Sequence, residues 1–243
     1  MDSNKTGVIV GSFVLALGLI AASYIASSTV MQAKALQDAT ITMTGSAKAT
    51  VHSDLVKWTG SFSRTVNIDQ VKDGYTQMKT DQTNLEAFLT KNGMAATDYK
   101  ISPVFMSQVY KQYDTSPIQY TLSQNLELSG TDLTKVEALP KHLQDLINLG
   151  ILFSSNNLEY YYTKLPDQRV ALLSDAVGDA KTRAEQIAKS SGLHVGAIRS
   201  ASMGVVQVLP PNSTDVSDYG SYDTSSVDKD IMVTVKTVFN LEK

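Results

Sequence analysis

The side chains that most often carry catalysis or bind metals are few in this chain. Only three of its 243 residues are histidine, His52, His142 and His194, and cysteine is absent. Protein zinc sites use ligands at short fixed spacings, and a thiol nucleophile, a disulfide or an iron–sulfur cluster needs cysteine. No such histidine spacing is present, so we expect no metal and no cofactor. We interpret the three histidines as surface residues.

Nucleophile and nucleotide motifs are missing as well. The serine-rich run at residues 200–204, SASMG, does not match the Gly-x-Ser-x-Gly elbow of α/β-hydrolases, and no glycine-rich phosphate loop occurs. Spacing in sequence does not reveal glycosidase-like carboxylate pairs, so that alternative stays open. A net charge of −3 argues against a nucleic-acid partner. The sequence therefore predicts a protein that is not an enzyme.

Tyrosines and an acidic loop are the remaining candidates for a functional surface. Tyr110, Tyr113, Tyr160 and Tyr162 lie in predicted strands. Tyrosine combines contact area with a polar tip, so these four are candidate interface residues, although strands also use tyrosine for packing alone. The segment 210–229 reads as a loop rich in Ser, Asp, Tyr and Gly. Loops of this length are functional or mobile in compact domains. Calcium-loop order is absent, so we interpret its aspartates as solvated.

The chain begins with a long apolar stretch. Residues 7–27 carry no ionisable side chain except the phenol of Tyr24, and a helix of this length spans roughly 30 Å, the thickness of the bilayer hydrocarbon. We predict a cytoplasmic tail at 1–6, a transmembrane signal anchor at 7–27, a linker at 28–38 and an extracytoplasmic domain at 39–243. The side chains expected in the bilayer are Val8, Phe13, Leu15, Leu19 and Ile25. A cleaved signal peptide and a buried helix are the alternatives.

The weak positive bias of the tail predicts its orientation. Lys5 and the amino terminus favour a cytoplasmic tail, offset by Asp2. The protein would then be a single-pass protein of the inner membrane, with its domain in the periplasm or outside the cell.

Hydrophobic periodicity after residue 37 predicts an α+β fold. Strands are expected at 41–46 and 56–62, joined as a hairpin near 52–54, and then at 100–113, 119–128, 151–163, 197–209 and 231–241. Helices are expected at 68–89, at 131–149 with an interruption at Pro140, and at 167–191. The resulting order, β-β-α-β-β-α-β-α-β-β, is typical of antiparallel sheets covered by helices.

The two long predicted helices each show an apolar face. The expected face of the first is Ile68, Val71, Tyr75, Met78, Leu85 and Leu89. The expected face of the second is Val170, Leu173, Val177, Ala180, Ala184 and Ile187. The alanines would let the second helix approach a sheet closely.

Three segments resemble the SIMPL-domain (DUF541) family over residues 39–241. These are residues 41–48 with Ser53-Asp54-Leu55, the helix end at 149–151, and the alanine-spaced helix that ends at Gly192 with Val195-Gly196 after it. The resemblance implies an exported, non-enzymatic protein of the bacterial envelope, and some members of the family assemble into rings or larger oligomers. It supplies no catalytic residues.

Three hypotheses follow. The first is a membrane-anchored, extracytoplasmic structural or interaction protein that self-assembles into an oligomer, such as a ring or a membrane scaffold. Its partners would be the membrane, further copies of itself and other envelope proteins. The second is an envelope ligand- or polymer-binding module with the 210–229 loop as a lid. The third is an unrecognised hydrolase.

Overall fold

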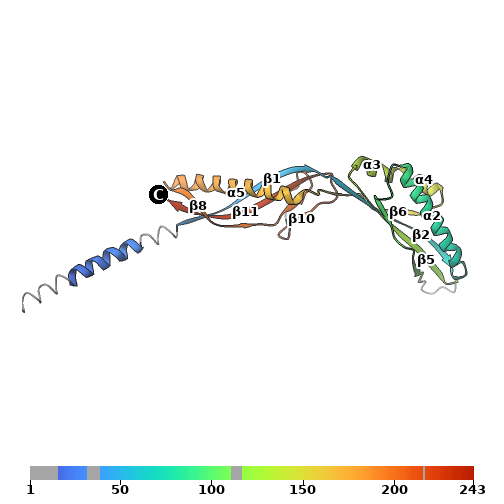
Figure 1. Cartoon of the computed structure of the whole chain (residues 1–243), viewed down its shortest axis with the longest axis horizontal. Helices are drawn as coiled ribbons and strands as arrows, with labels where there is room; N and C mark the ends of the chain where they lie inside the picture. Colours follow the sequence, from blue (N-terminus) through green and yellow to red (C-terminus); the bar gives the residue numbers. More distant parts are fainter. Residues whose placement is uncertain (1–15, 32–38, 111–116, 216) are drawn as a thin grey trace, which may run out of the picture. The chain divides into compact units, whose positions relative to one another are not determined.

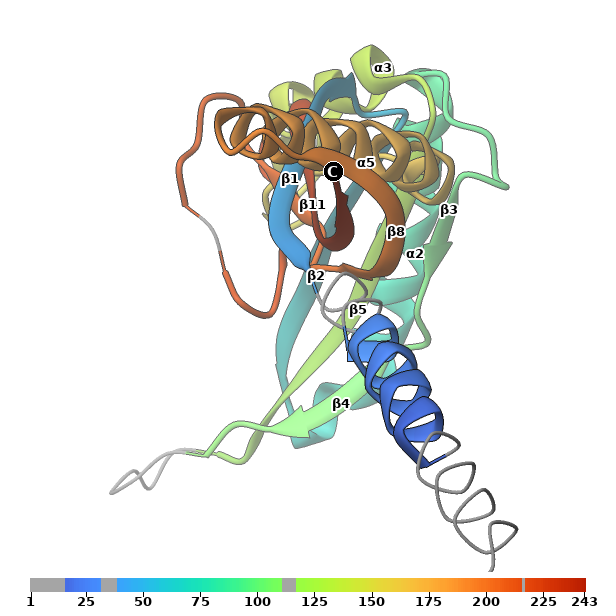
Figure 2. The ribbon, with the colours of Figure 1, turned by 90° about the vertical axis from the view of Figure 1, so that its left-hand side faces the viewer.

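The computed structural model describes residues 16–31, 39–110, 117–215 and 217–243 (Figures 1 and 2). From Thr40 onward the chain folds into two sheets and their helices, which confirms the α+β prediction. Two compact units are present. Unit 1 comprises residues 1–47, 170–205 and 233–243, and unit 2 comprises residues 48–169 and 206–232.

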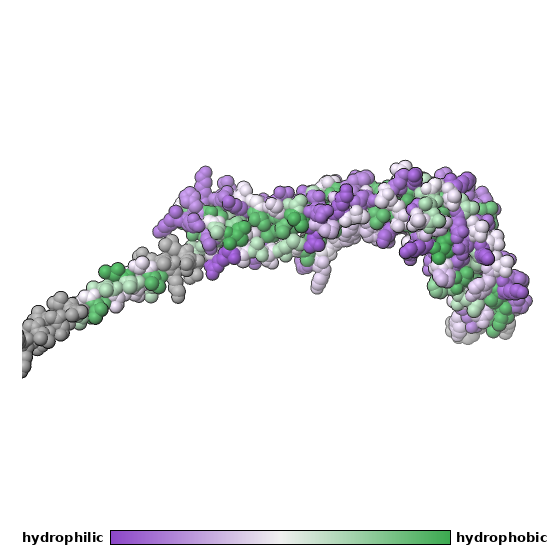
Figure 3. All heavy atoms as spheres, in the orientation of Figure 1, coloured by the Kyte–Doolittle hydropathy of each residue, from purple (hydrophilic) through white to green (hydrophobic). Residues whose placement is uncertain are grey.

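The described part of the N-terminal segment, residues 16–31, is a helix. Its Leu19 and Ile25 side chains are each 64% exposed, and Figure 3 shows apolar atoms along its surface. Within the described part of the chain, no helix is both long enough and apolar enough to cross a membrane. Three of the predicted anchor residues, Val8, Phe13 and Leu15, lie outside the described residues.

Unit 2 is built on a six-stranded sheet with the long strands β2 and β5 at its centre. The strands are β2 (Leu55–Asn67), β3 (Tyr99–Ile101), β4 (Phe105–Gln108), β5 (Gln119–Gly130), β6 (Phe153–Ser155) and β7 (Glu159–Tyr161). β3 and β4 both pair with β5, and β6 and β7 both pair with β2. The predicted strands at 100–113 and 151–163 are therefore each two short strands. Pro103 lies in the first break, where it cannot donate a ladder hydrogen bond.

One face of this sheet packs against helix α2 (Val71–Lys91), as Figure 1 shows. Trp58 and Phe62 from β2 and Leu85 from α2 belong to one buried core. The predicted face of α2 is partly wrong, because Ile68 and Tyr75 are exposed. Gly74 is buried against the sheet instead, and an added Cβ there would lie 2.8 Å from Leu122 Cδ1.

Three short helical segments follow β5. They are α3 (Leu133–Ala138), the 3-10 helix η2 (Leu139–His142) and α4 (Gln144–Asn148). Asp132 caps α3 by accepting a hydrogen bond from the Lys135 backbone N–H. Pro140 lies in η2, so the predicted interruption of the 131–149 helix is confirmed.

The second sheet has five strands in the order β1-β11-β9-β10, with β8 also paired to β11. Its strands are β1 (Thr40–His52), β8 (His194–Met203), β9 (Gln207–Leu209), β10 (Ser221–Tyr222) and β11 (Asp228–Glu242). β1 and β11 contribute residues to both units. The predicted strand at 197–209 is again two strands, and the predicted 210–229 loop contains β10.

The predicted hairpin at residues 41–62 is wrong, because β1 and β2 belong to different sheets. Alternation of apolar and polar residues indicates a strand and its faces, but it does not select the partner strand. At the junction, Ser53 donates its N–H to the Val227 carbonyl oxygen at 2.9 Å. Asp54 accepts from both the N–H and the hydroxyl of Thr163, each at 2.8 Å. These bonds hold the chain to distant segments instead of turning it back on itself.

We expect Asp54→Ala to lower the free energy of unfolding by about 2 kcal/mol, because it removes two hydrogen bonds to a carboxylate. Urea unfolding followed by far-UV circular dichroism measures the loss. Asp69→Ala is the matched control, since Asp69 is exposed and the described residues show no side-chain hydrogen bond to it. Equal midpoints for the two variants would contradict the role given to Asp54.

Unit 1 contains most of helix α5 (Leu165–Ser190), which lies against β1 through alanines. Its buried side chains are Leu172, Ala176, Ala180, Ala184 and Ala188. Gly45 of β1 makes the closest approach, against the Ala176 carbonyl oxygen and the Ala180 nitrogen. The predicted face is therefore correct for Ala180 and Ala184 and wrong for Val170 and Ile187, which are exposed. Close helix–sheet packing selects the small residues, so the larger ones lie outside the contact.

Candidate functional site

The face of the unit 2 sheet opposite α2 is polar along both central strands. Side chains alternate across a strand, so the neighbours of the buried core residues lie on this outer face. On β2 and β5 the register places serine, threonine, asparagine, lysine and glutamate there. The outer-face residues of the two strands are Lys57, Thr59, Ser61, Ser63, Ser123, Asn125, Glu127 and Ser129. An antiparallel sheet with one face in water has this pattern.

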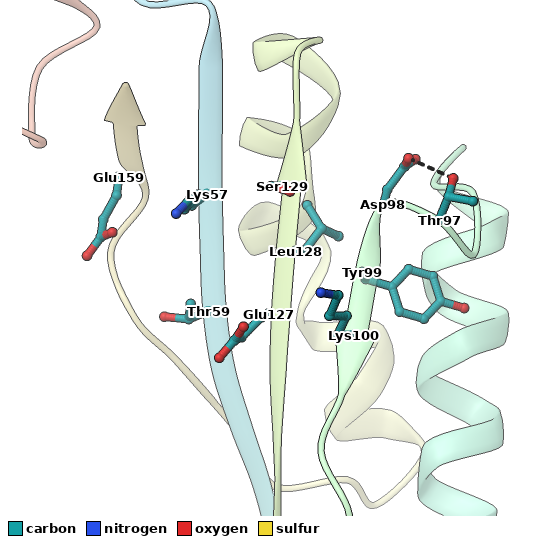
Figure 4. A pocket seen from close by; sticks show the side chains of 10 residues that line it. All are labelled: Lys57, Thr59, Thr97, Asp98, Tyr99, Lys100, Glu127, Leu128, Ser129 and Glu159. Atoms are coloured by element: carbon teal, nitrogen blue, oxygen red, sulfur yellow. Dashed lines mark hydrogen bonds between the residues drawn. The ribbon is translucent and has the colours of Figure 1, made fainter. Parts of the chain in front are cut away.

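A hollow of about 380 Å³ lies on this outer face (Figure 4). Lys57 lies directly opposite Glu159 of β7, and Lys100 of β3 lies directly opposite Glu127. Across the neighbouring strands β7, β2, β5 and β3, the side-chain charges are therefore negative, positive, negative and positive. The ten residues that line the hollow are Lys57, Thr59, Thr97, Asp98, Tyr99, Lys100, Glu127, Leu128, Ser129 and Glu159.

The charged groups of the hollow are suited to binding. Glu127 and Glu159 are both exposed and each lies opposite a lysine. A general acid of the glycosidase type needs a carboxyl group in an apolar, desolvated setting, which neither residue has. The lysines, carboxylates and hydroxyls that line the hollow instead offer hydrogen-bond donors and acceptors to a polar ligand. The Lys57 ammonium also lies 4.9 Å from the centre of the Tyr161 ring.

The four candidate interface tyrosines have different environments. Tyr110 is 88% exposed, and Tyr162 is partly exposed with its N–H donating to the Tyr222 hydroxyl at 2.9 Å. Tyr160 is buried in the unit 2 core, where its hydroxyl donates to Glu137 at 3.0 Å, so this side chain is not available to a surface partner. Burial raises the pKa of Tyr160, and the bond to Glu137 raises it further. Tyr113 lies outside the described residues.

All three histidines are exposed, as the sequence predicted. His52 Nδ1 lies 2.7 Å from an Asp228 carboxylate oxygen, and both side chains are open to solvent. Among the residues that the structure describes, no three histidine, aspartate or glutamate side chains lie close enough together to hold a metal ion.

The predicted acidic loop contains a buried cation that sequence reasoning missed. Lys229 is fully buried, and its Nζ donates to the backbone oxygens of Asp223 at 2.6 Å and Ser226 at 2.7 Å. The same ammonium lies 3.3 Å from the Asp223 carboxylate. Residues 223–229 therefore fold around Lys229. The sequence pattern indicates that Lys229 is buried, because it lies two residues before Ile231 and four before Val233, on the buried face of β11.

Two aspartates of this region are not solvated as the sequence predicted, because Asp223 in the loop is half-buried and Asp230, at the start of β11, is buried. Burial acts to raise the pKa of Asp223, but hydrogen bonds from Ser226 and Ser225 outweigh it and hold that pKa well below its usual range. Hydrogen bonds from Lys48 and Thr50 lower the pKa of Asp230, which also accepts from the Asn212 N–H at 3.2 Å. Burial lowers the pKa of Lys229, against the opposing effect of Asp223.

The second half of the loop is held to β7 and β9 of unit 2 by backbone hydrogen bonds. Asp223 N–H donates to the Val208 carbonyl oxygen, and Thr224 accepts from the Tyr160 N–H, each at 2.8 Å. A hollow of about 290 Å³ lies beside the first half and is lined in part by Ser213, Asp215 and Ser217. The first half is also held by hydrogen bonds, since the Asn212 N–H donates to Asp230 and the Gln207 side-chain amide donates to the Ser217 carbonyl oxygen. The lid role of the 210–229 loop stays a prediction.

One comparison with known proteins gives a family match. The model of the SIMPL family, described as a protein of unknown function (DUF541), matches residues 41–239. The chain belongs to the SIMPL family. The match runs from β1 to β11 of this SIMPL protein and includes both units. A comparison with curated proteins found no match.

Proposed function

We propose that this SIMPL protein is a membrane-anchored, extracytoplasmic structural or interaction protein that self-assembles into an oligomer. The observation that carries the proposal is a group of exposed apolar side chains along one margin of the unit 2 sheet. Tyr110 is 88% exposed, Phe105 57%, Met106 49% and Ile118 48%. Large apolar side chains grouped at a sheet margin are typical of an interaction surface.

The proposed anchor is the apolar segment 7–27. Its described part is helical, and Leu19 and Ile25 lie open on that helix. A bilayer would cover these side chains. With the tail in the cytoplasm, units 1 and 2 would lie in the periplasm or outside the cell. Further copies of the chain and other envelope proteins are the partners that fit this placement.

The proposed role is non-enzymatic. The exposed Glu127 and Glu159 lack the desolvated setting of a general acid, and the exposed histidines lie far from both in sequence. A ring or membrane scaffold is the form of assembly that a symmetric oligomer of anchored subunits would take.

Size-exclusion chromatography with light scattering tests self-association on the detergent-solubilised full-length protein. We expect a particle that contains several copies. Only single copies across a wide concentration range would contradict the proposal. Protease added to spheroplasts tests the orientation: we expect digestion of units 1 and 2, and full protection would reverse the proposed topology.

A ligand- or polymer-binding module is the second candidate, favoured by the hollow beside Ser213, Asp215 and Ser217. In that case the 210–229 loop would act as the lid. A thermal-shift screen with glycans, peptides and metal salts tests it. The absence of a shift with every compound would count against this candidate.

A further inference from the structure

β4 forms an uncovered margin of the unit 2 sheet. All four of its residues are exposed. Among the strands that the structure describes, β4 pairs with β5 alone (Figure 2). Its register with β5 is unbroken from Phe105 opposite Ser123 to Gln108 opposite Tyr120. Val109 continues the register by donating its N–H to the Gln119 carbonyl oxygen at 2.8 Å.

This hydrogen bond fixes which backbone groups of β4 face outward. Residues of an antiparallel strand alternate between those bonded to one neighbour and those whose groups point the other way. Since Val109 bonds to β5, Ser107 and Phe105 do so as well. The N–H and C=O groups of Met106 and Gln108 therefore point away from β5, toward the open margin.

The strand lacks the features that usually protect a sheet margin. Natural margins carry charges, prolines or bulges, or are covered by another segment. The sequence of β4, Phe-Met-Ser-Gln, contains neither charge nor proline, and no bulge interrupts its register. By contrast, β8 shows register shifts against β11, and β7 donates the Tyr160 N–H to the Thr224 carbonyl oxygen.

We propose that β4 pairs antiparallel with β4 of a second copy, about a twofold axis at Ser107. This inference rests on the proposed self-assembly and names the surface that carries it. Met106 exchanges two hydrogen bonds with Gln108 of the partner subunit, and Gln108 exchanges two with Met106 of the partner subunit. Phe105 lies opposite Val109 of the partner subunit. The two six-stranded sheets become one continuous sheet.

The hydrogen-bond parity allows a second copy as the occupant, and because β4 carries no charge, pairing two copies brings no like charges together. The outward-facing residues Met106 and Gln108 lie symmetrically about Ser107, so the margin is complementary to itself in the antiparallel direction. The N–H and C=O groups of Met106 and Gln108 are then all hydrogen-bonded to the second copy. Each apolar Phe105 side chain also meets Val109 of the partner subunit, which removes exposed apolar surface from water.

Disulfide formation by Ser107→Cys tests the register directly. Ser107 would face its own symmetry mate in a non-hydrogen-bonded pair, where Cα atoms lie about 4.5 Å apart, within the range that a disulfide spans. The natural chain has no cysteine, so this variant carries one thiol. Mild oxidation of the full-length variant in membranes should give a disulfide-linked dimer on non-reducing gels.

Ser154→Cys is the matched control. Ser154 is an exposed serine on β6, which lies beside β2 at the other edge of the sheet from β4. We expect at least a tenfold greater dimer yield for Ser107→Cys than for Ser154→Cys. Equal yields, or no dimer from Ser107→Cys, would overturn the proposed pairing.

Met106→Pro tests the same pairing without a thiol. The Met106 N–H points away from β5, so proline removes an intermolecular donor and leaves the ladder with β5 intact. We expect the number of copies in each full-length particle to fall by half or more. Met106→Lys, which keeps the backbone and adds a charge to the margin, should do the same. Unchanged particles would overturn the pairing if the unsubstituted protein is oligomeric, whereas single copies of the unsubstituted protein would overturn self-assembly itself.

Discussion

Gly45→Ala is expected to lower the free energy of unfolding by about 3 kcal/mol or more, or to prevent the protein from accumulating. An alanine Cβ at this position would overlap the Ala176 carbonyl oxygen and the Ala180 nitrogen, and would lie 2.8 Å from Ala180 Cβ. Two of these three atoms are helix backbone, so no side-chain rotation relieves the overlap. Urea unfolding of the detergent-solubilised full-length protein, followed by far-UV circular dichroism, measures the effect.

Gly178→Ala provides a control with the opposite expected sign. Gly178 lies on α5 with no atom within 4 Å of an added Cβ. Alanine in a helix is favoured over glycine by roughly 0.5–1 kcal/mol, so this variant should unfold at a slightly higher urea concentration. If both variants behaved alike, the close contact between β1 and α5 would be wrong.

The second large effect is expected at Lys229. Lys229→Met should cost about 3–5 kcal/mol, because it leaves the half-buried Asp223 carboxylate without its cation and removes a donor from the backbone oxygens of Asp223 and Ser226. A buried charge that loses its partner is costly, whereas a solvated lysine contributes little. The change in urea midpoint again measures the loss.

Lys236→Met separates burial from charge. Lys236 lies on the same strand, β11, but its side chain is exposed. Its replacement should change the unfolding free energy by less than about 0.5 kcal/mol. A loss at Lys236 as large as the loss at Lys229 would show that net charge, and not the buried pair, decides the stability.

Local patterns in the sequence predicted much of the fold. Alternation identified β1, β2 and β11, and the interruption at Pro140 was found because proline cannot continue a helix. Pairing was harder to predict. β1 and β2 are neighbours in sequence but belong to different sheets, because the bonds of Ser53 and Asp54 to residues distant in the chain decide the path at their junction.

Helix faces were predicted only where the apolar residues were also the closely packed ones. On α5 the branched residues Val170 and Ile187 are exposed, whereas the residues closest to Gly45 are Ala176 and Ala180. On α2, Gly74 is buried against Leu122 and the neighbouring Tyr75 is exposed. Glycine and alanine contribute little to a hydrophobic pattern, yet they lie where a helix and a strand pack most closely.

The candidate functional surface was predicted in part. Tyrosine as a residue type predicts both Tyr110 and Tyr160 as interface residues, but Tyr110 is exposed beside β4 and Tyr160 is buried. Residue type alone does not distinguish the two. The open backbone groups of Met106 and Gln108 carry no sequence signal, since they follow from the hydrogen-bond parity between β4 and β5.

The mass of the full-length protein, extracted with its surrounding lipid into nanodiscs, tests self-assembly most directly. One copy of the chain has a mass of 26.3 kDa. Self-assembly predicts particles whose protein mass is a fixed multiple of this value, and loss of that multiple in Met106→Pro. Particles that contain one copy, at the protein density found in the native membrane, would contradict it.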